Sequence, residues 1–292
     1  FCARLGLLAF YILKNERAKT IQNLTVAYGD SKGTKEIRRM AKEVFSNLGR
    51  GAAEVLIKLE IDDKETYFSN VEVIGKEHAE KAYARGKGII NIVPHLGCWE
   101  ALPKAYTMLD FKAGAVVKSL KNERLNNWLL QKRQFKGFKV LQRGSSYKTI
   151  LNFLKQNNSL GMLIDQDTSV KGVFVDFYNK PAYTPIGAAM LALDSDATVF
   201  TTSYIRTKGN KYKFIFGEAL EVSRTGDRKE DLRVNTERSH QAVDKQVVPY
   251  QEQCVCMHER AKDHPEMIAN KEREKQELRQ KRKAERLSEN QE

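Results

Sequence analysis

The stretch that decides the fold runs from residue 89 to residue 100 and reads Ile-Ile-Asn-Ile-Val-Pro-His-Leu-Gly-Cys-Trp-Glu. Its first five residues are β-branched and apolar except for Asn91, which predicts a buried strand that ends at Pro94. His95 then stands at the strand exit, Gly97 permits a tight turn, and Glu100 begins a helix. The tip of a strand that leads into a helix is where α/β proteins place reacting groups. We therefore expect the functional site at this turn.

His95 and Glu100 are the two kinds of side chain that a proton transfer needs. Imidazole has an ordinary pKa close to neutrality, so it can accept a proton and return it. A carboxylate at one ring nitrogen fixes the tautomer and leaves the other nitrogen for a substrate. On one continuous helix the two residues would point about 140° apart, so we expect His95 on the loop, with Glu100 orienting it and helix N-terminal amides near a developing oxyanion. The alternative is a half-buried histidine with a structural role.

The segments on either side of this turn alternate between strand and helix patterns. Strands are predicted at 70–75, 113–117, 138–141 and 160–167, and helices at 77–85, 100–109 and 145–156. Residues 198–206 and 211–216 form a predicted hairpin around Lys208-Gly209-Asn210. Residues 1–60 read as helices, with Arg50 and Glu54 on a solvated face, and a further helix is predicted at 235–246. This order indicates an α/β fold.

Composition narrows the choices without deciding among them. The chain has 292 residues, 41% of them hydrophobic, and a net charge of +13, which suits a nucleic acid, an anionic membrane or an acidic protein partner. The four cysteines lack a disulfide spacing and indicate a reducing compartment. No metal site is expected from Cys254, Cys256 and His258, because a second ligand pair is missing.

The apolar residues 5–13 are too few to cross a bilayer. They fit either the end of an upstream membrane anchor or a first amphipathic helix of the domain. No complete transmembrane helix is predicted.

Several charged residues outside the central turn are candidate ligands for an anionic or polar substrate. The segment 118–137 is rich in lysine and arginine, and guanidinium binds phosphate in a fork without losing its charge. A solvated basic face is the alternative for any one of these residues. Asp165 and Gln166 lie at the exit of another predicted strand, where they either bind an acceptor or cap the next element. Asp165 and Asp167 alone do not predict a metal.

The pattern His-x4-Glu at residues 95–100 resembles the first motif of the lysophospholipid acyltransferase superfamily. With Glu in place of the more usual Asp, it is more similar to the lipid A biosynthesis lauroyl/myristoyl acyltransferases. Three further segments resemble that family's motifs in the same order: the basic segment around Arg133, Asp165-Gln166 with the glycine-plus-hydrophobic residues 169–178, and residues 181–192. Cys254 and Cys256 stand where the family usually has tryptophans.

The resemblance implies a central mixed sheet flanked by helices, of the glycerolipid acyltransferase type. It implies an acyltransferase domain over 1–260, with a helical part at 1–60, and a charged, solvated or disordered tail over 261–292. His95 would deprotonate an acceptor hydroxyl while Glu100 orients it, and residues 173–178 would line an acyl slot. The implied substrate-binding residues are Arg133, with Arg124 as the alternative, and Asp165, Gln166 and Lys171.

The implied reaction moves a fatty acyl chain from an acyl carrier protein thioester to a hydroxyl of a lipid A precursor. It would take place at the inner membrane, on the cytoplasmic face, with no cofactor, metal or nucleic acid. The +13 charge suits both an acidic carrier protein and an anionic lipid. Two alternatives stay open: an acyltransferase for a glycerolipid or a mannosylated lipid, and a non-catalytic basic protein that binds a membrane surface.

Overall fold

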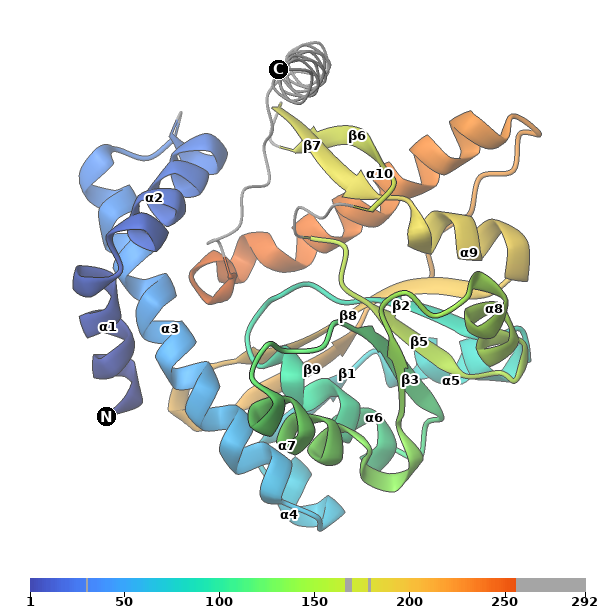
Figure 1. Cartoon of the computed structure of the whole chain (residues 1–292), viewed down its shortest axis with the longest axis horizontal. Helices are drawn as coiled ribbons and strands as arrows, with labels where there is room; N and C mark the ends of the chain where they lie inside the picture. Colours follow the sequence, from blue (N-terminus) through green and yellow to red (C-terminus); the bar gives the residue numbers. More distant parts are fainter. Residues whose placement is uncertain (30, 166–169, 178–179, 256–292) are drawn as a thin grey trace, which may run out of the picture.

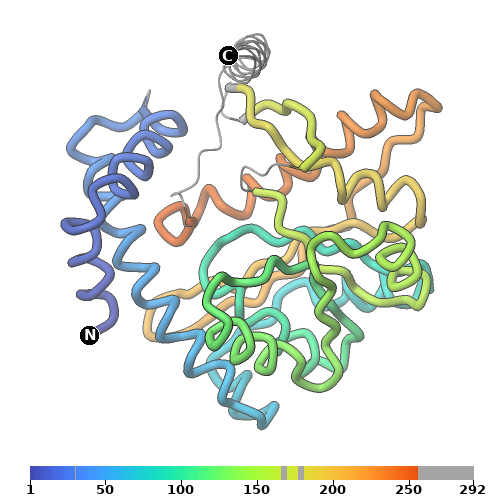
Figure 2. Tube along the Cα trace, viewed as in Figure 1, coloured from blue at the N-terminus to red at the C-terminus, as the bar shows by residue number. Residues whose placement is uncertain are grey.

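A computed structural model describes residues 1–29, 31–165, 170–177 and 180–255 of the chain. A seven-stranded sheet with helices on both faces forms the body of the described part, and the three N-terminal helices stand at one side of it (Figure 1). The path of the chain returns repeatedly to the sheet, so segments far apart in sequence become neighbours (Figure 2). The predicted α/β class with a central mixed sheet is therefore confirmed.

The strand order in the sheet is β1-β9-β8-β2-β5-β3-β4. Neighbouring strands run parallel except for β8 and β9, which are antiparallel, as the predicted hairpin requires. The strands are β1 (Val71–Ile74), β2 (Ile89–Ile92), β3 (Ala113–Val117), β4 (Lys139–Gln142), β5 (Ser159–Met162), β8 (Thr198–Arg206) and β9 (Tyr212–Phe216).

Strand β2 lies in the middle of the sheet, and all four of its residues are buried. A strand covered by helices on both faces needs apolar side chains on both sides, which explains the Ile-Ile-Asn-Ile sequence. The polar exception, Asn91, accepts a hydrogen bond of 2.6 Å from the hydroxyl of Thr202, so its amide is not left without a partner. In the register, Ile89 faces Ser159 of β5 on one side and Thr198 of β8 on the other.

Helices cover the two faces of the sheet and create two hydrophobic cores. Ile89 belongs to the core beneath one set of helices, and Ile90 and Ile92 belong to the core beneath the other, as alternation along a strand dictates. The first set comprises α4 (Lys64–Phe68), α5 (Lys76–Ala84) and α6 (Leu102–Met108), which follows the short 3₁₀ helix η1 (Trp99–Ala101). The second set comprises α8 (Tyr147–Lys155), α9 (Gly187–Ser195) and α10 (Arg228–Val247), which continues into η4 (Val248–Gln253).

The N-terminal helices are α1 (Cys2–Ile12), α2 (Lys14–Tyr28) and α3 (Thr34–Glu60). They share a small core that includes Phe10, Leu24 and Phe45. Helices α1 and α3 cross in direct backbone contact, because a Cβ added at Gly6 would lie 2.1 Å from the carbonyl oxygen of Phe45. The three helices therefore pack against one another around this core.

Three local expectations differ from the structure. The predicted strand at 160–167 ends at Met162, so Asp165 stands on the loop beyond it. Residues expected as a loop and a proline turn instead form an antiparallel pair outside the main sheet, β6 (Gly172–Phe177) and β7 (Lys180–Pro185). Helix α10 begins at Arg228, ahead of the expected residue 235, because Asp227 caps it by accepting from the amides of Lys229 and Glu230. The predicted tail lies outside the described residues.

Candidate active site

His95 lies on a loop beyond the carboxyl end of β2, as the sequence predicts. Backbone hydrogen bonds fix this loop: the amide of Leu96 donates to Pro94 and the amide of Val255 donates to the carbonyl of His95, at 2.8 and 3.0 Å. Gly97 has φ of 61°, and a Cβ there would lie 2.3 Å from the carbonyl oxygen of Tyr204. Only glycine fits this approach, so the turn is held in one conformation.

The backbone amides of Gly97 and Cys98 are not available to an oxyanion. Gly97 donates its N–H to the carbonyl of Gln253 at 3.1 Å, and Cys98 donates to Tyr204 at 2.8 Å. Since each amide has one hydrogen, both are already used to anchor the loop. The helical segment that follows starts at Trp99, so the expectation of helix N-terminal amides near an oxyanion concerns Trp99 and the residues after it and stays a prediction.

The residue that forms a hydrogen bond with the His95 ring is Asp165. Its Oδ1 lies 2.6 Å from Nδ1 of His95, and its Oδ2 accepts from the backbone N–H of His95, also at 2.6 Å. The carboxylate side chain is 2% exposed and the imidazole 19%. Because a carboxylate can only accept, Nδ1 carries the hydrogen and Nε2 has a free lone pair. Nε2 has no hydrogen-bond partner within the described parts of the chain.

Glu100 does not orient His95, which corrects the sequence-based expectation. Glu100 sits in η1 and forms a bidentate pair with Arg133, with Nε–Oε2 at 2.9 Å and Nη2–Oε1 at 2.5 Å. The reason is the strand order: β5 pairs directly with β2 in parallel, so the loops beyond their carboxyl ends are neighbours. Asp165, on the loop after β5, therefore occupies the position next to Nδ1 of His95. The Arg133 side chain is 14% exposed, and the carboxylate of Glu100 balances its positive charge.

The other predicted ligands are dispersed. Arg124 is exposed at the start of α7 (Glu123–Arg133), and Lys171 is exposed just before β6. Gln166 lies outside the described residues. Of the candidate substrate-binding residues, the structure brings Asp165 to His95 and Arg133 to Glu100.

Two apolar pockets meet at Trp99 and Glu100. A groove of about 380 Å³ lies between α3 and α7, with walls that include Val55, Leu125 and Trp128. A narrower pocket of about 70 Å³ continues beneath Arg133, over Gly161 and Ala115 of the sheet. The edge of the Trp99 ring meets the His95 imidazole with centroids 5.4 Å apart, which connects the pockets to the dyad. Of the predicted acyl-slot residues 173–178, those at 173–176 line neither pocket, and the rest of the segment is not described at the side-chain level.

One functional feature was missed from the sequence. Glu54 of α3 forms a bidentate ion pair with Arg206 of β8, and the two side chains are 12% and 10% exposed. The same guanidinium donates to Asn47 at 2.6 Å, and Gln253 donates to the backbone carbonyl of Arg206. This network joins α3, the sheet and the segment that anchors Gly97, so Glu54 is not on a solvated face as expected. The sequence carries a signal for Glu54, since Arg50 and Glu54 resemble a pattern of the family described above, but a solvated face was preferred for both.

Cys98 lies beside the dyad but is not poised as a nucleophile. Burial raises the pKa of its thiol to about 12, and the neighbouring Glu54 carboxylate adds to the rise. A thiol with this pKa stays protonated at neutral pH, and the thiolate is the reactive form. The arrangement therefore favours direct attack on an acyl donor over an acyl-cysteine intermediate.

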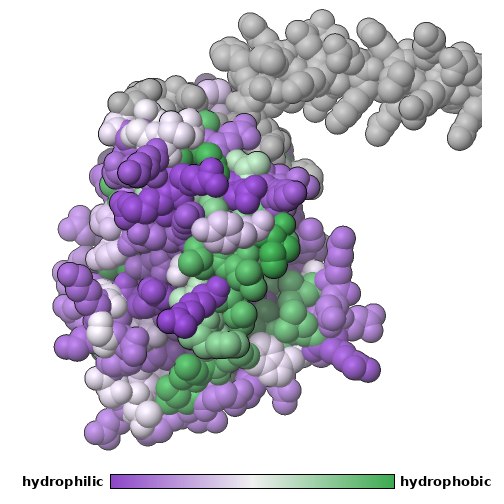
Figure 3. Space-filling view, turned by 90° about the vertical axis from the view of Figure 1, so that its left-hand side faces the viewer, coloured by the Kyte–Doolittle hydropathy of each residue, from purple (hydrophilic) through white to green (hydrophobic). Residues whose placement is uncertain are grey.

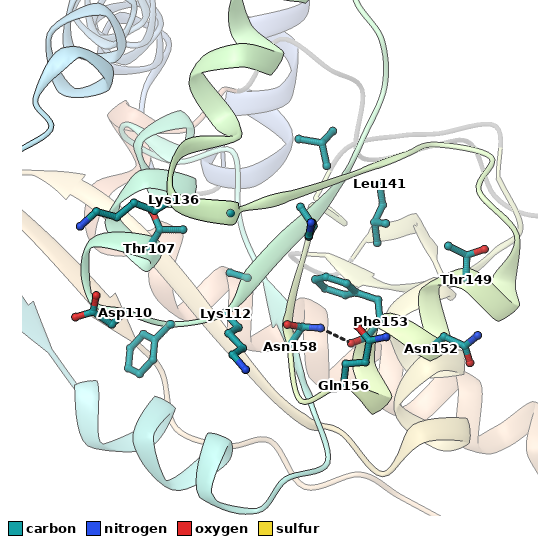
Figure 4. Close-up of a pocket in the computed structure, with 15 residues that line it drawn as sticks. Thr107, Asp110, Lys112, Lys136, Leu141, Thr149, Asn152, Phe153, Gln156 and Asn158 are labelled. Atoms are coloured by element: carbon teal, nitrogen blue, oxygen red, sulfur yellow. Dashed lines mark hydrogen bonds between the residues drawn. The ribbon is translucent and has the colours of Figure 1, made fainter.

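A separate polar cavity of about 760 Å³ opens at the amino ends of β3 and β4 (Figure 4). Lys112, Gln156 and Asn158 are among the residues around it. It lies at the amino ends of the strands, whereas His95 follows a carboxyl end, and no predicted site residue lines it. We assign it no part in the chemistry at His95.

The arrangement places a histidine, with one nitrogen held by a buried carboxylate and the other nitrogen free, beside two pockets that suit apolar groups. The chain belongs to the bacterial lipid A biosynthesis acyltransferase family, whose model matches residues 1–263. It is therefore an acyltransferase by family, and the resemblance of its motifs to this family is confirmed.

The similar proteins include two kinds of lipid acyltransferase. A lipid A biosynthesis acyltransferase of Haemophilus influenzae is 25% identical over 262 residues, which cover 86% of this chain and 77% of the relative. Phosphatidylinositol mannoside acyltransferases of Mycobacterium tuberculosis and Mycolicibacterium smegmatis are 27% and 26% identical over 132 and 134 residues. Those matches cover 44% of this chain and 42% and 44% of the mycobacterial proteins, so less than half their length is compared.

Proposed function

We propose that the protein transfers a fatty acyl chain from a thioester to a hydroxyl of a glycolipid, and that the acceptor is a lipid A precursor. The observation that carries this proposal is the His95–Asp165 pair, with Nδ1 held at 2.6 Å and Nε2 unoccupied beside two apolar pockets. The family match is the second support.

In the proposed reaction, Nε2 of His95 takes the proton of the acceptor hydroxyl. The resulting alkoxide attacks the thioester carbonyl, a C–O bond forms, and the C–S bond then breaks. The leaving thiolate takes the proton back from His95, so the enzyme ends as it began. Asp165 stabilises the imidazolium that exists between these steps. The Glu100–Arg133 pair adds a charged wall next to the acyl pockets.

The apolar pockets support a long-chain donor. Sixteen residues surround the groove between α3 and α7, and most of them are aliphatic or aromatic. Burial of each methylene contributes about 0.8 kcal/mol, so a chain of lauroyl or myristoyl length gains most of its affinity from such walls. We propose acyl carrier protein as the donor, since an acidic carrier complements the net charge of +13.

The alternative acceptor that we propose is a mannosylated lipid. The observation that favours it is the similarity to the mycobacterial phosphatidylinositol mannoside acyltransferases over 132 residues. A glycerolipid acceptor would use the same His95 chemistry. A purely surface-binding protein would leave the His95–Asp165 pair without a purpose.

We propose that the protein works at the cytoplasmic face of the inner membrane. Across the described ranges, no helix combines the length and apolarity needed to cross a bilayer. Helix α1 nevertheless exposes Leu5, Leu8 and Ile12, which are 49%, 54% and 64% exposed. Figure 3 shows hydrophobic residues gathered in a band on the side of the molecule where the N-terminal helices lie. Lipid contact would cover such a band.

The test is an acyl-transfer assay with acyl carrier protein thioesters and three acceptors: a lipid A precursor, a phosphatidylinositol mannoside and a glycerolipid. Mass spectrometry of the products identifies the acceptor. His95→Ala should abolish product while binding to anionic vesicles persists. No product with any acceptor from the folded wild-type protein would overturn the proposal.

A further inference from the structure

Helix α7 differs from the other walls of the groove because it is hardly embedded in the protein. None of its eleven residues is buried. Its inward side carries Leu125, Trp128 and Leu129, which line the groove opposite α3. Helix α3, in contrast, is fixed by its own buried residues and by the Glu54–Arg206 pair. One wall of the groove is thus rigid, and the other is held only lightly.

Two ion pairs at one end connect α7 to the rest of the described chain. Arg133 binds Glu100, and Lys132 donates to Glu60 at the end of α3 at 2.7 Å. At the other end, hydrogen bonds are local: Asn122 caps the helix by accepting from Leu125. No further hydrogen bond or ion pair from α7 to another element is present in the described ranges.

We propose that α7 is a lid on the apolar groove, and that Lys132 and Glu60 are positioning residues that hold it closed. This inference rests on the proposed function, which supplies the fatty chain that occupies the groove. Closure does two things at once: it completes the wall around the chain and it places Arg133 against Glu100. Opening releases the wall without disturbing His95 and Asp165, which lie on loops beyond β2 and β5 and are bonded to each other.

The lid makes a kinetic prediction that a fixed wall does not. In this proposal the Lys132–Glu60 pair forms in the closed lid whether the groove is empty or filled, so it stabilises the closed lid in both states. Loss of the pair should therefore speed the association and the dissociation of a chain by the same factor and leave the Kd unchanged. Lys132 and Glu60 are 27% and 60% exposed, so the expected factor is small, roughly two- to fivefold.

The experiment is stopped-flow binding of parinaric acid to the full chain. Both tryptophans of the sequence, Trp99 and Trp128, line the groove, so energy transfer from tryptophan to this fluorescent fatty acid reports its arrival. The test variant is Glu60→Gln, and the charge exchange Glu60→Lys with Lys132→Glu should restore slow rates. The matched control is Asp110→Asn, which removes another exposed ion pair between elements, to Lys64 at 2.8 Å.

Equal acceleration of both rates in Glu60→Gln, reversed by the charge exchange and absent in Asp110→Asn, supports the lid. Rates unchanged in Glu60→Gln, or a change in Kd carried by dissociation alone, would overturn it while leaving the acyl groove intact. Failure of the wild-type protein to bind parinaric acid would instead overturn the proposed function, and the lid with it.

Discussion

Exchange of Asp165 for asparagine tests the dyad most directly. Asp165→Asn preserves the shape of the side chain but replaces one acceptor oxygen with an NH₂ group. The remaining oxygen can still accept from the backbone N–H of His95, a hydrogen bond that Oδ2 accepts at 2.6 Å in the wild-type protein. The NH₂ group then faces Nδ1, which must become the acceptor. The ring hydrogen moves to Nε2, and the nitrogen that should take the substrate proton no longer has a lone pair.

The size of the effect follows from this tautomer change at a carboxylate that is 2% exposed. General base catalysis contributes about 100- to 10,000-fold, and the matching exchange in a serine-protease triad removes about 10,000-fold. We expect kcat of Asp165→Asn to fall about 100- to 10,000-fold, which corresponds to roughly 2.7 to 5.4 kcal/mol of transition-state stabilisation. KM should change little, because Asp165 does not line either apolar pocket.

The assay is steady-state acyl transfer, with circular dichroism to confirm that each variant is folded. The control is Asp194→Asn, because Asp194 accepts hydrogen bonds from Tyr147 and Arg228 on a different part of the molecule. That variant should keep the wild-type rate. The reasoning would be refuted if Asp165→Asn stayed within about threefold of wild type while Glu100→Gln lost activity, since Glu100 would then be the group that orients His95.

Three other outcomes are expected. Gly161→Leu should reduce the transfer of long acyl chains relative to short ones by about tenfold, because residue 161 faces the narrow pocket. Competition between thioesters of different chain length measures this ratio. An added Cβ would meet Ala115 at an ordinary 3.4 Å, so the variant should still fold. Arg206→Met should lower the free energy of unfolding by about 3 to 5 kcal/mol in denaturant titration, because Glu54 would be left buried without its partner. Cys98 should resist iodoacetamide at pH 8 until the protein unfolds, and stability should fall above pH 9, because its pKa is raised from 9.0 to about 12 and only the unfolded thiol ionises there.

Local features of the fold were predictable because they depend on neighbouring residues. The β2 strand, the hairpin of β8 and β9, and the helices after each strand follow from apolar runs, glycine turns and caps. Strands β6 and β7 were not predicted, since Pro181 and Pro185 read as a turn. Proline is tolerated there because the pair has only two strands, and both are edges.

The sequence identified His95 as the base but not Asp165 as the residue bonded to it. His95 was identified because a strand, a proline and a glycine surround it in sequence. Asp165 was recognised as polar at a strand exit, but its contact with His95 depends on β5 lying next to β2. The local pattern of each strand does not contain that order. The nearer Glu100 was therefore chosen, and the pairing of Glu54 with Arg206, 152 residues apart, was hidden for the same reason.

The position of β2 has a consequence for how the protein matures. Both of its neighbours, β5 and β8, are synthesised after it, and His95 and Asp165 are 70 residues apart. A nascent chain that ends at the exposed turn around Gly144 has the base but neither flanking strand. Such a fragment should be inert, and mixing it with the complementary fragment should restore turnover only when the missing strands add on both sides. Acyl-transfer activity is thus expected only after β5 and β8 have paired with β2.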